Sequence, residues 1–194
     1  MHHSIKGECP HMYIELRFHG RGGQGAVTAA TILAKASVIE GKYAQAIPNF
    51  NAERRGAPVE VYSRISDKFI GRHSQVENPD AVVVLDYQLI KMVDILKGLK
   101  NNGIVIINSQ NKESIGNVRT YCVDATSIAK RHGLIVSGWP TVNTSILGAI
   151  SRSLGIVSID SIIKAIHEHF SSPKLAKLNA EAALDAYKET ILCG

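Results

Sequence analysis

A short glycine-rich segment near the start of the chain carries the residue types best suited to binding an anion. Gly20, Gly22 and Gly25 have the G-x-G-x-x-G spacing, with Gly23 as an additional glycine. Such a loop lets the backbone turn tightly and approach a ligand, and free N–H groups of a following helix would point at that ligand. Arg21 adds a positive charge. The candidate binding residues here are Gly20, Arg21, Gly22, Gly23, Gln24 and Gly25.

The elements on either side of this loop are predicted to position it. In residues 13–18, apolar side chains alternate with Glu15 and Arg17, which predicts a strand with two unlike faces. Residues 26–40 contain no Pro or Gly and place apolar side chains at helical spacing. The order is therefore strand, glycine loop, helix.

The next strand tests whether the loop binds a dinucleotide. Residues 43–47 are expected to complete a parallel, right-handed βαβ unit. A nicotinamide-binding unit needs an Asp or Glu at the end of that strand for the ribose hydroxyls, but the chain continues with Pro48 and Asn49. The nearest acid, Glu53, lies in a turn beside two arginines. The glycines match this fingerprint and the acid does not.

Arg54 and Arg55 are a second candidate for anion binding. A loop after the second strand would lie at the carboxyl edge of the sheet, beside the glycine loop. Guanidinium groups there suit a phosphate, a carboxylate or an acidic partner surface. A solvated charged turn, in which Glu53 offsets one arginine, fits the spacing equally well.

The remaining patterns indicate an α/β fold. We expect a single Rossmann-like domain over residues 12–194, with a mainly parallel sheet, a β-hairpin insertion and a helical C-terminal part, after a flexible leader at 1–11. The expected strands are residues 59–65 (half-exposed and antiparallel), 68–71 (its short return partner), 81–85, 104–107 and 118–123. The expected helices are residues 88–99, 126–132, a helix ending at 154, one from 158 or 160 to 170, and one starting at 173.

Three further residues could belong to a site. Asp86 follows a buried strand and could bind a ligand, although capping the next helix is the favoured interpretation. Trp139, the only tryptophan, is assigned a packing role by default, with a ligand-facing role as the alternative. Asn143 lies where the following helix begins and joins the candidate binding residues.

Composition excludes several classes of function. The net charge of +5 comes from scattered basic residues, and aromatic residues are only 6% of the chain, which disfavours nucleic-acid binding. No apolar run is long enough to cross a membrane, and no signal-peptide pattern is present. His2, His3, Cys9 and His11 could in principle bind a metal, but a disordered leader is the favoured interpretation of that segment, so no metal site is expected.

The cysteines and the absent motifs point to a subunit. Cys9, Cys122 and Cys193 form no C-x-x-C pair, so no iron–sulfur cluster and no disulfide are expected, and Cys122 is expected to be a small buried residue. A cytoplasmic location follows as the expectation. The chain also lacks a G-x-S-x-G elbow, a Walker loop and H-E-x-x-H. An anion-binding loop without a catalytic set suggests one component of a larger enzyme.

Several segments together resemble a known family. Residues 17–30, 41–46, 53–59 and 79–86, with 142–144 and 147–149, look like the gamma subunit of pyruvate and related 2-oxoacid:ferredoxin oxidoreductases. The resemblance runs from about residue 12 to about residue 187. It implies a Rossmann-like lobe that helps to assemble the complex and handles coenzyme A. It also implies that thiamine diphosphate and iron–sulfur clusters reside on the alpha, beta and delta partners.

The resemblance implies a reaction for the whole complex. Such enzymes decarboxylate a 2-oxoacid, pass electrons to ferredoxin and transfer the acyl group to coenzyme A. Pyruvate is expected as the 2-oxoacid from the closeness of the resemblance alone. Two alternatives stay open on the residues: a stand-alone dinucleotide-binding protein and a purely structural subunit.

Overall fold

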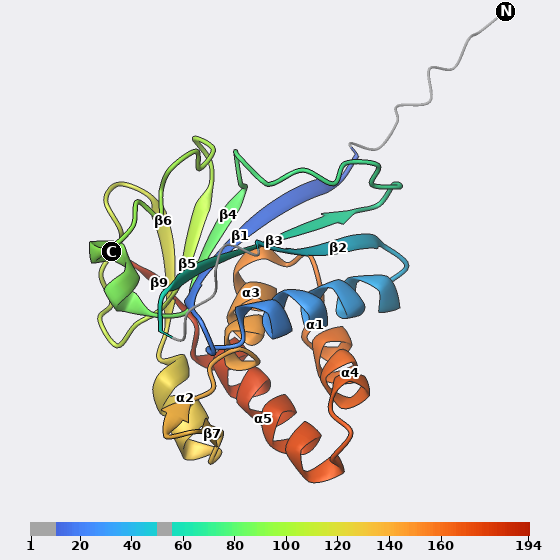
Figure 1. Cartoon of the computed structure of the whole chain (residues 1–194), viewed down its shortest axis with the longest axis vertical. Helices are drawn as coiled ribbons and strands as arrows, with labels where there is room; N and C mark the ends of the chain where they lie inside the picture. Colours follow the sequence, from blue (N-terminus) through green and yellow to red (C-terminus); the bar gives the residue numbers. More distant parts are fainter. Residues whose placement is uncertain (1–10, 50–55) are drawn as a thin grey trace, which may run out of the picture.

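The computed structural model describes residues 11–49 and 56–194 (Figure 1). Within those residues the main sheet has seven strands, in the order β2 (Tyr43–Pro48), β3 (Pro58–Ser66), β1 (Tyr13–Arg21), β4 (Ala81–Val84), β5 (Ile104–Asn108), β6 (Arg119–Val123) and β9 (Ile191–Cys193). Strands β1, β4, β5 and β6 are parallel to one another. Strand β3 is antiparallel to β1 and β2, and β9 is antiparallel to β6. The expected α/β fold with a mainly parallel sheet is confirmed.

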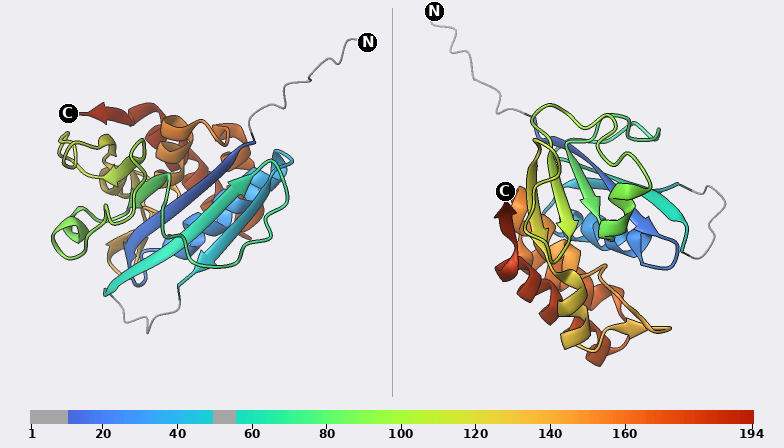
Figure 2. Two further views of the ribbon diagram at one scale, coloured as in Figure 1. Left: turned by 90° about the horizontal axis from the view of Figure 1, so that it is seen from above. Right: turned by 90° about the vertical axis from the view of Figure 1, so that its left-hand side faces the viewer.

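Helices cover one face of the sheet (Figures 1 and 2). They are α1 (Ala26–Ile39), α2 (Ala125–Arg131), α3 (Ser145–Leu154), α4 (Ile159–His169) and α5 (Pro173–Glu189). Each lies close to its predicted position. Side chains of Asp124, Ser158 and Ser172 accept hydrogen bonds from backbone N–H groups at the starts of α2, α4 and α5. No helix in the described ranges is both long and apolar enough to span a membrane.

The β2–β3 pair differs from the predicted hairpin. Strand β3 pairs antiparallel with β1 and with β2, both of which precede it, whereas residues 68–71 form no strand. Strand β3 inserts between β1 and β2, so β2 runs parallel to β1 without pairing with it. The expected half-exposed character of β3 is also wrong, because residues 61–66 are buried on both faces. The alternation of polar and apolar residues predicted that the polar side chains of β3 face solvent. They are instead covered by the segment that follows β3.

The predicted helix at 88–99 is mostly absent. Only a short 3-10 helix, η1 (Tyr87–Lys91), forms there, followed by turns. In this segment the Arg17 guanidinium donates hydrogen bonds to the carbonyls of Ile95 (2.9 Å) and Lys97 (2.6 Å). The apolar side chains at helical spacing still pack on the sheet, against Val82, Val84 and Val105.

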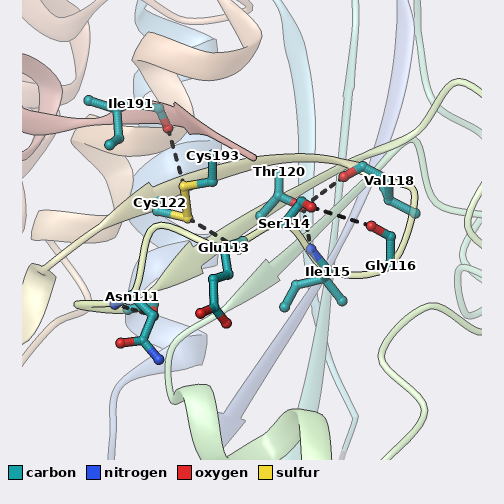
Figure 3. The surroundings of a disulfide bond; sticks show 11 residues. Asn111, Glu113, Ser114, Ile115, Gly116, Val118, Thr120, Cys122, Ile191 and Cys193 are labelled. Atoms are coloured by element: carbon teal, nitrogen blue, oxygen red, sulfur yellow. Dashed lines mark hydrogen bonds between the residues drawn. A yellow bond between two sulfur atoms is a disulfide. The ribbon is translucent and has the colours of Figure 1, made fainter.

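The C-terminal part is not entirely helical. Strand β9 adds to the sheet edge, and a small hairpin, β7 (Ile135–Val136) with β8 (Trp139–Pro140), precedes α3. Pairing of β9 with β6 places Cys193 against Cys122, and the two form a disulfide with a Cα–Cα distance of 6.0 Å (Figure 3). The expectation of no disulfide is therefore wrong, although Cys122 is buried as predicted. The pairing depends on a strand of three residues that has too little pattern to predict.

Candidate functional site

The glycine loop connects β1 to α1 in a braced, tight turn. The side-chain oxygen of Gln24 accepts a hydrogen bond from the Arg21 backbone N–H (2.8 Å), and Gln24 N–H donates to the Arg21 carbonyl (2.9 Å). Two further backbone hydrogen bonds join Gly22 to the segment at Gly56. The Gly22 N–H donates to the Ala57 carbonyl, and the Gly56 N–H donates to the Gly22 carbonyl. Gly25 is the N-cap of α1, and no side chain caps that helix. The first N–H groups of α1 therefore face the loop without a side-chain acceptor.

The structure brings Asn143, one of the candidate binding residues, against this loop. A Cβ atom at Gly25 would lie 2.5 Å from Asn143 Nδ2, and Gly25 has a φ of +80°. Both features restrict this position to glycine. Asn143 itself is 5% exposed, and its side-chain oxygen accepts from Thr144 N–H (2.9 Å). Asn143 thus supports the loop from inside the fold.

Arg21 is paired with a carboxylate, which the sequence pattern did not reveal. Its Nε donates to Asp86 Oδ2, and its Nη1 donates to the Gly56 carbonyl (3.2 Å). The other oxygen of Asp86 accepts from Gln88 N–H (2.9 Å), so Asp86 caps η1 as favoured from the sequence. One carboxylate therefore joins the glycine loop to η1. Arg54 and Arg55, the other candidate cations, lie outside the described residues.

Two neighbouring cavities open beside the loop. The first, which we call the loop cavity, has a volume of about 400 Å³ and is lined by Arg21, Gly22, Gly23 and Gln24 together with residues of the β7–β8 hairpin. The second, the strand-end cavity, has a volume of about 550 Å³ and is lined by residues that follow β4, β5 and β6. Gln24, Trp139 and Pro140 line both. The carboxyl edge of parallel strands is the usual ligand site of open α/β sheets.

Trp139 lies on the surface between the two cavities. Its side chain is 58% exposed, so the default packing role is not confirmed, and its alternative role facing a ligand remains a prediction. Ser137 (φ +50°) and Gly138 (φ +81°) form the two-residue turn of the β7–β8 hairpin. Two consecutive positive φ angles are characteristic of the type I′ turn that holds short hairpins. The hairpin was not predicted; the Ser-Gly pair between apolar residues is the signal in the sequence that could have indicated it.

His19 lies next to the loop, on the sheet face opposite the helices, and is 2% exposed. Arg17 Nε donates to His19 Nε2 (3.0 Å), so His19 carries its proton on Nδ1, which is 3.7 Å from a Glu60 carboxylate oxygen. Burial lowers the pKa of His19 from 6.5 to about 4; the Glu60 charge opposes this decrease and the Arg17 charge adds to it. His19 is therefore neutral in the folded protein at neutral pH.

The low pKa of His19 predicts a pH-dependent stability. The folded-state pKa of about 4 lies below the unfolded value of 6.5. The contribution of neutral, buried His19 to the free energy of unfolding is therefore fully present above pH 6.5 and is lost as the pH falls toward 4. The full difference corresponds to about 3 kcal/mol. Urea unfolding at pH 7, 6 and 5 should show decreasing stability, with a shallower decrease in His19→Gln. Equal slopes in the two proteins would show that another group carries the effect.

Among the described residues, no cluster of three or more His, Cys, Asp or Glu side chains could hold a metal ion. Cys122 and Cys193 are joined to each other. The site consists instead of backbone N–H groups, Arg21 paired with Asp86, a second carboxylate (Asp124), one further cation (Lys130), neutral polar side chains and an exposed indole. These groups can bind and orient an anionic or aromatic ligand.

Comparisons with known proteins agree with this picture. The sequence profile of the pyruvate ferredoxin/flavodoxin oxidoreductase family matches residues 15–189. A pyruvate synthase subunit PorC from Methanothermobacter thermautotrophicus is 53% identical over 176 residues, covering 91% of this chain and 95% of that protein. A pyruvate/ketoisovalerate oxidoreductases common subunit gamma from Thermococcus litoralis is 50% identical over 186 residues, covering 92% and 98%.

A solved structure is also similar. The crystal structure of pyruvate oxidoreductase subunit PORC from Thermotoga maritima has a TM-score of 0.79 and 36% identity, covering 93% of this chain and 98% of that one. These relatives are all subunits of oxidoreductases, which leaves the stand-alone dinucleotide-binding alternative without support. The chain thus belongs to the pyruvate ferredoxin/flavodoxin oxidoreductase family, as the gamma subunit of a multi-subunit 2-oxoacid:ferredoxin oxidoreductase.

Proposed function

We propose that this gamma subunit binds coenzyme A for a complex that converts pyruvate to acetyl-coenzyme A and passes the electrons to ferredoxin. Pyruvate is proposed as the 2-oxoacid because relatives about half identical to the chain are named for pyruvate. The observation that carries the coenzyme A role is the loop cavity, in which the glycine loop and Arg21 line one hollow at the N-terminus of α1.

The groups lining the loop cavity suit the phosphates of coenzyme A. A pyrophosphate accepts hydrogen bonds from backbone N–H groups, and a helix N-terminus favours negative charge. Arg21 is 19% exposed at its side chain, so a phosphate oxygen could reach its guanidinium while Asp86 holds the other side. A ligand could approach the backbone closely at Gly23, because no protein atom lies within 4 Å of the place where a Cβ atom would be.

The remaining chemistry is assigned to partners. We propose that thiamine diphosphate and the iron–sulfur clusters belong to alpha, beta and delta subunits, and that ferredoxin accepts the electrons in the cytoplasm. The two cysteines of the described ranges support this division, because they are used in a disulfide and are not free thiolates. A purely structural gamma subunit is the competing possibility, and the following experiment separates it from a coenzyme A role.

Replacing Arg21 with alanine should raise the KM for coenzyme A of the assembled complex roughly ten-fold, because a charge-assisted hydrogen bond is lost. The KM for pyruvate should change little. Steady-state kinetics with a ferredoxin acceptor measure both constants. Arg119→Ala is the matched control, because Arg119 is exposed at the opposite end of the parallel strands and lines neither cavity.

Size-exclusion chromatography must accompany the kinetics. An assembled Arg21→Ala complex with an unchanged KM for coenzyme A would overturn the ligand role. Loss of assembly in this variant alone would instead support the structural alternative, because Arg21 also connects the loop to Gly56 and η1.

A further inference from the structure

Strand β2 forms an edge of the main sheet without the charges that normally protect such an edge. In the described part of the chain it is the outermost strand beside β3 (Figure 1), and its six residues, Tyr-Ala-Gln-Ala-Ile-Pro, carry no charge. Natural edge strands are usually very short, charged, bulged or covered, because their free N–H and C=O groups otherwise pair with another chain. The opposite edge strand, β9, has only three residues. Strand β2 is therefore the edge best able to accept another strand.

The β2–β3 register shows which backbone groups of β2 point outward. Directly after β2, the Asn49 N–H donates to the Glu60 carbonyl (3.3 Å), in the same antiparallel register as the strand itself. Because hydrogen-bonded and non-hydrogen-bonded positions alternate, the odd-numbered residues of β2 bond to β3 and the even-numbered residues point outward. These are Ala44, Ala46 and Pro48, all only partly buried, and Pro48 has no N–H.

Exposed apolar side chains gather at the start of β2. Tyr43 is 48% exposed, and Phe69, from the segment after β3, is 78% exposed and lies edge-on to it with a centroid distance of 6.1 Å. Val38, which is 58% exposed, ends α1 just before the turn into β2, where its carbonyl accepts from Gly41 N–H (2.9 Å). A cluster of exposed apolar side chains is typical of a surface that another protein covers.

We propose that β2 pairs antiparallel with β2 of a second copy of this chain, across a twofold axis at Gln45, so that the two sheets become continuous. In this register Ala44 of each copy lies opposite Ala46 of the other, and the outward N–H and C=O groups of both residues are paired. A register shifted toward the end of the strand would place Pro48 opposite Ala44 and lose a donor.

The side chains of β2 are complementary to their own copies in this register. Ala44 and Ala46 pack against the core on the helix side, so Tyr43 and Ile47 lie on the other face of the sheet. Tyr43 would lie opposite Ile47 of the second copy, and an aromatic residue opposite a β-branched one is a favourable pair. No like charges meet across the axis, because β2 has none. A charged strand would find no opposite charge on β2.

The native mass of the full chain tests the pairing. At about 100 µM, a concentration suited to weak interfaces, the wild type should have twice the chain mass of 21.0 kDa. Ala44→Pro should have the mass of one chain, because proline removes an outward N–H and fills the path of the second strand. The bonds from β2 to β3 do not use this N–H. Ala44→Ser keeps the N–H and should match the wild type. Size-exclusion chromatography with light scattering measures the mass, and circular dichroism confirms that each variant is folded.

A charge on the edge provides a second test that leaves the backbone unchanged. Tyr43→Lys places like charges close to the twofold axis and should also give the mass of one chain. Leu192→Lys is the matched control, because Leu192 is 59% exposed on β9, at the opposite edge of the same sheet, and its variant should keep the double mass.

Cross-linking tests the register itself. Opposite residues of antiparallel strands have Cβ atoms about 4.5–5.5 Å apart, within reach of a disulfide. With Cys9 replaced by Ser, Gln45→Cys should form an intermolecular disulfide when oxidised glutathione accepts the electrons. Asn102→Cys, at an exposed turn, should not. Intact-mass analysis without a reducing agent detects the linked pair.

The outcomes that overturn the pairing are distinct from those that test coenzyme A binding. A wild-type chain that keeps the mass of one copy, or a double mass that survives both Ala44→Pro and Tyr43→Lys, would overturn it. So would an assembled complex from which Ala44→Pro releases a different subunit, because that subunit would then occupy the edge. Tyr43 and Ala44 line neither cavity beside the glycine loop, so the KM for coenzyme A does not depend on these results.

Discussion

Replacing Gly148 with alanine should lower the free energy of unfolding by about 3 kcal/mol. A Cβ atom at this position of α3 would lie 1.9 Å from the Ala183 carbonyl oxygen and 2.8 Å from the Tyr187 backbone nitrogen. Both atoms belong to the backbone of α5, so no side-chain rotation relieves the overlap. Helices α3 and α5 would have to separate, which would open the packed core between them.

The expected destabilisation is opposite in sign to the effect that the intrinsic helix propensities of glycine and alanine would give. Alanine is favoured over glycine within a helix by about 0.8–1.0 kcal/mol, so a stabilised variant is expected if the helices do not approach closely. Gly71→Ala is the matched control, because the atom nearest to a Cβ at Gly71 would be Phe69 Cε1, at 3.8 Å. This variant should leave the free energy of unfolding nearly unchanged. Urea unfolding at constant pH measures both. An unchanged or higher urea midpoint for Gly148→Ala would contradict the close approach of α3 and α5 at this position.

Local patterns were sufficient to predict the elements that carry the glycine loop. The alternation in residues 13–18, the glycines and the uninterrupted run at 26–40 are short-range features, and the structure has β1, the loop and α1 there. The continuous apolar runs likewise predicted β4 and β5, which are buried on both faces. The family resemblance rested on the same segments and is confirmed by the comparisons.

Features that depend on distant segments could not be predicted in this way. The turns after η1, in place of a regular helix, include the Ile95 carbonyl, which accepts a hydrogen bond from Arg17, 78 residues earlier in the chain. Strand β9 is three residues long and forms only where β6 offers an edge. The disulfide follows from that pairing and not from cysteine spacing.

The candidate site shows the same division. Glycine spacing placed the loop and its single arginine, and the structure brings Asn143 against it. The Asp86 carboxylate that pairs with Arg21 is 65 residues further along the chain. The prediction that Asp86 caps the next helix is confirmed, but the sequence did not indicate that its second carboxylate oxygen pairs with Arg21. A binding site built at the edge of a sheet depends on such pairs between strand ends, which one-dimensional spacing does not contain.

Replacing Arg64 with leucine should destabilise the protein by about 3–5 kcal/mol, the usual cost of removing one partner of a buried ion pair. The Arg64 side chain is 0% exposed and donates to Glu15 (2.8 Å) and to the carbonyls of Arg72 (3.3 Å) and Gln75 (3.2 Å). The variant leaves the Glu15 carboxylate, 10% exposed at its side chain, without its cation, and two carbonyls without their donor. Chemical denaturation measures the loss.

Two comparisons separate charge from lost packing. Arg131→Leu removes an arginine that is 51% exposed and paired with Asp185 and Glu189, and it should cost about 1 kcal/mol or less. The double variant Glu15→Leu/Arg64→Leu removes both buried charges and should be more stable than Arg64→Leu alone, because an unpaired buried charge costs more than the absence of both. If Arg64→Leu costs no more than Arg131→Leu, the buried pair and its bonds to the carbonyls of Arg72 and Gln75 do not stabilise the fold as expected.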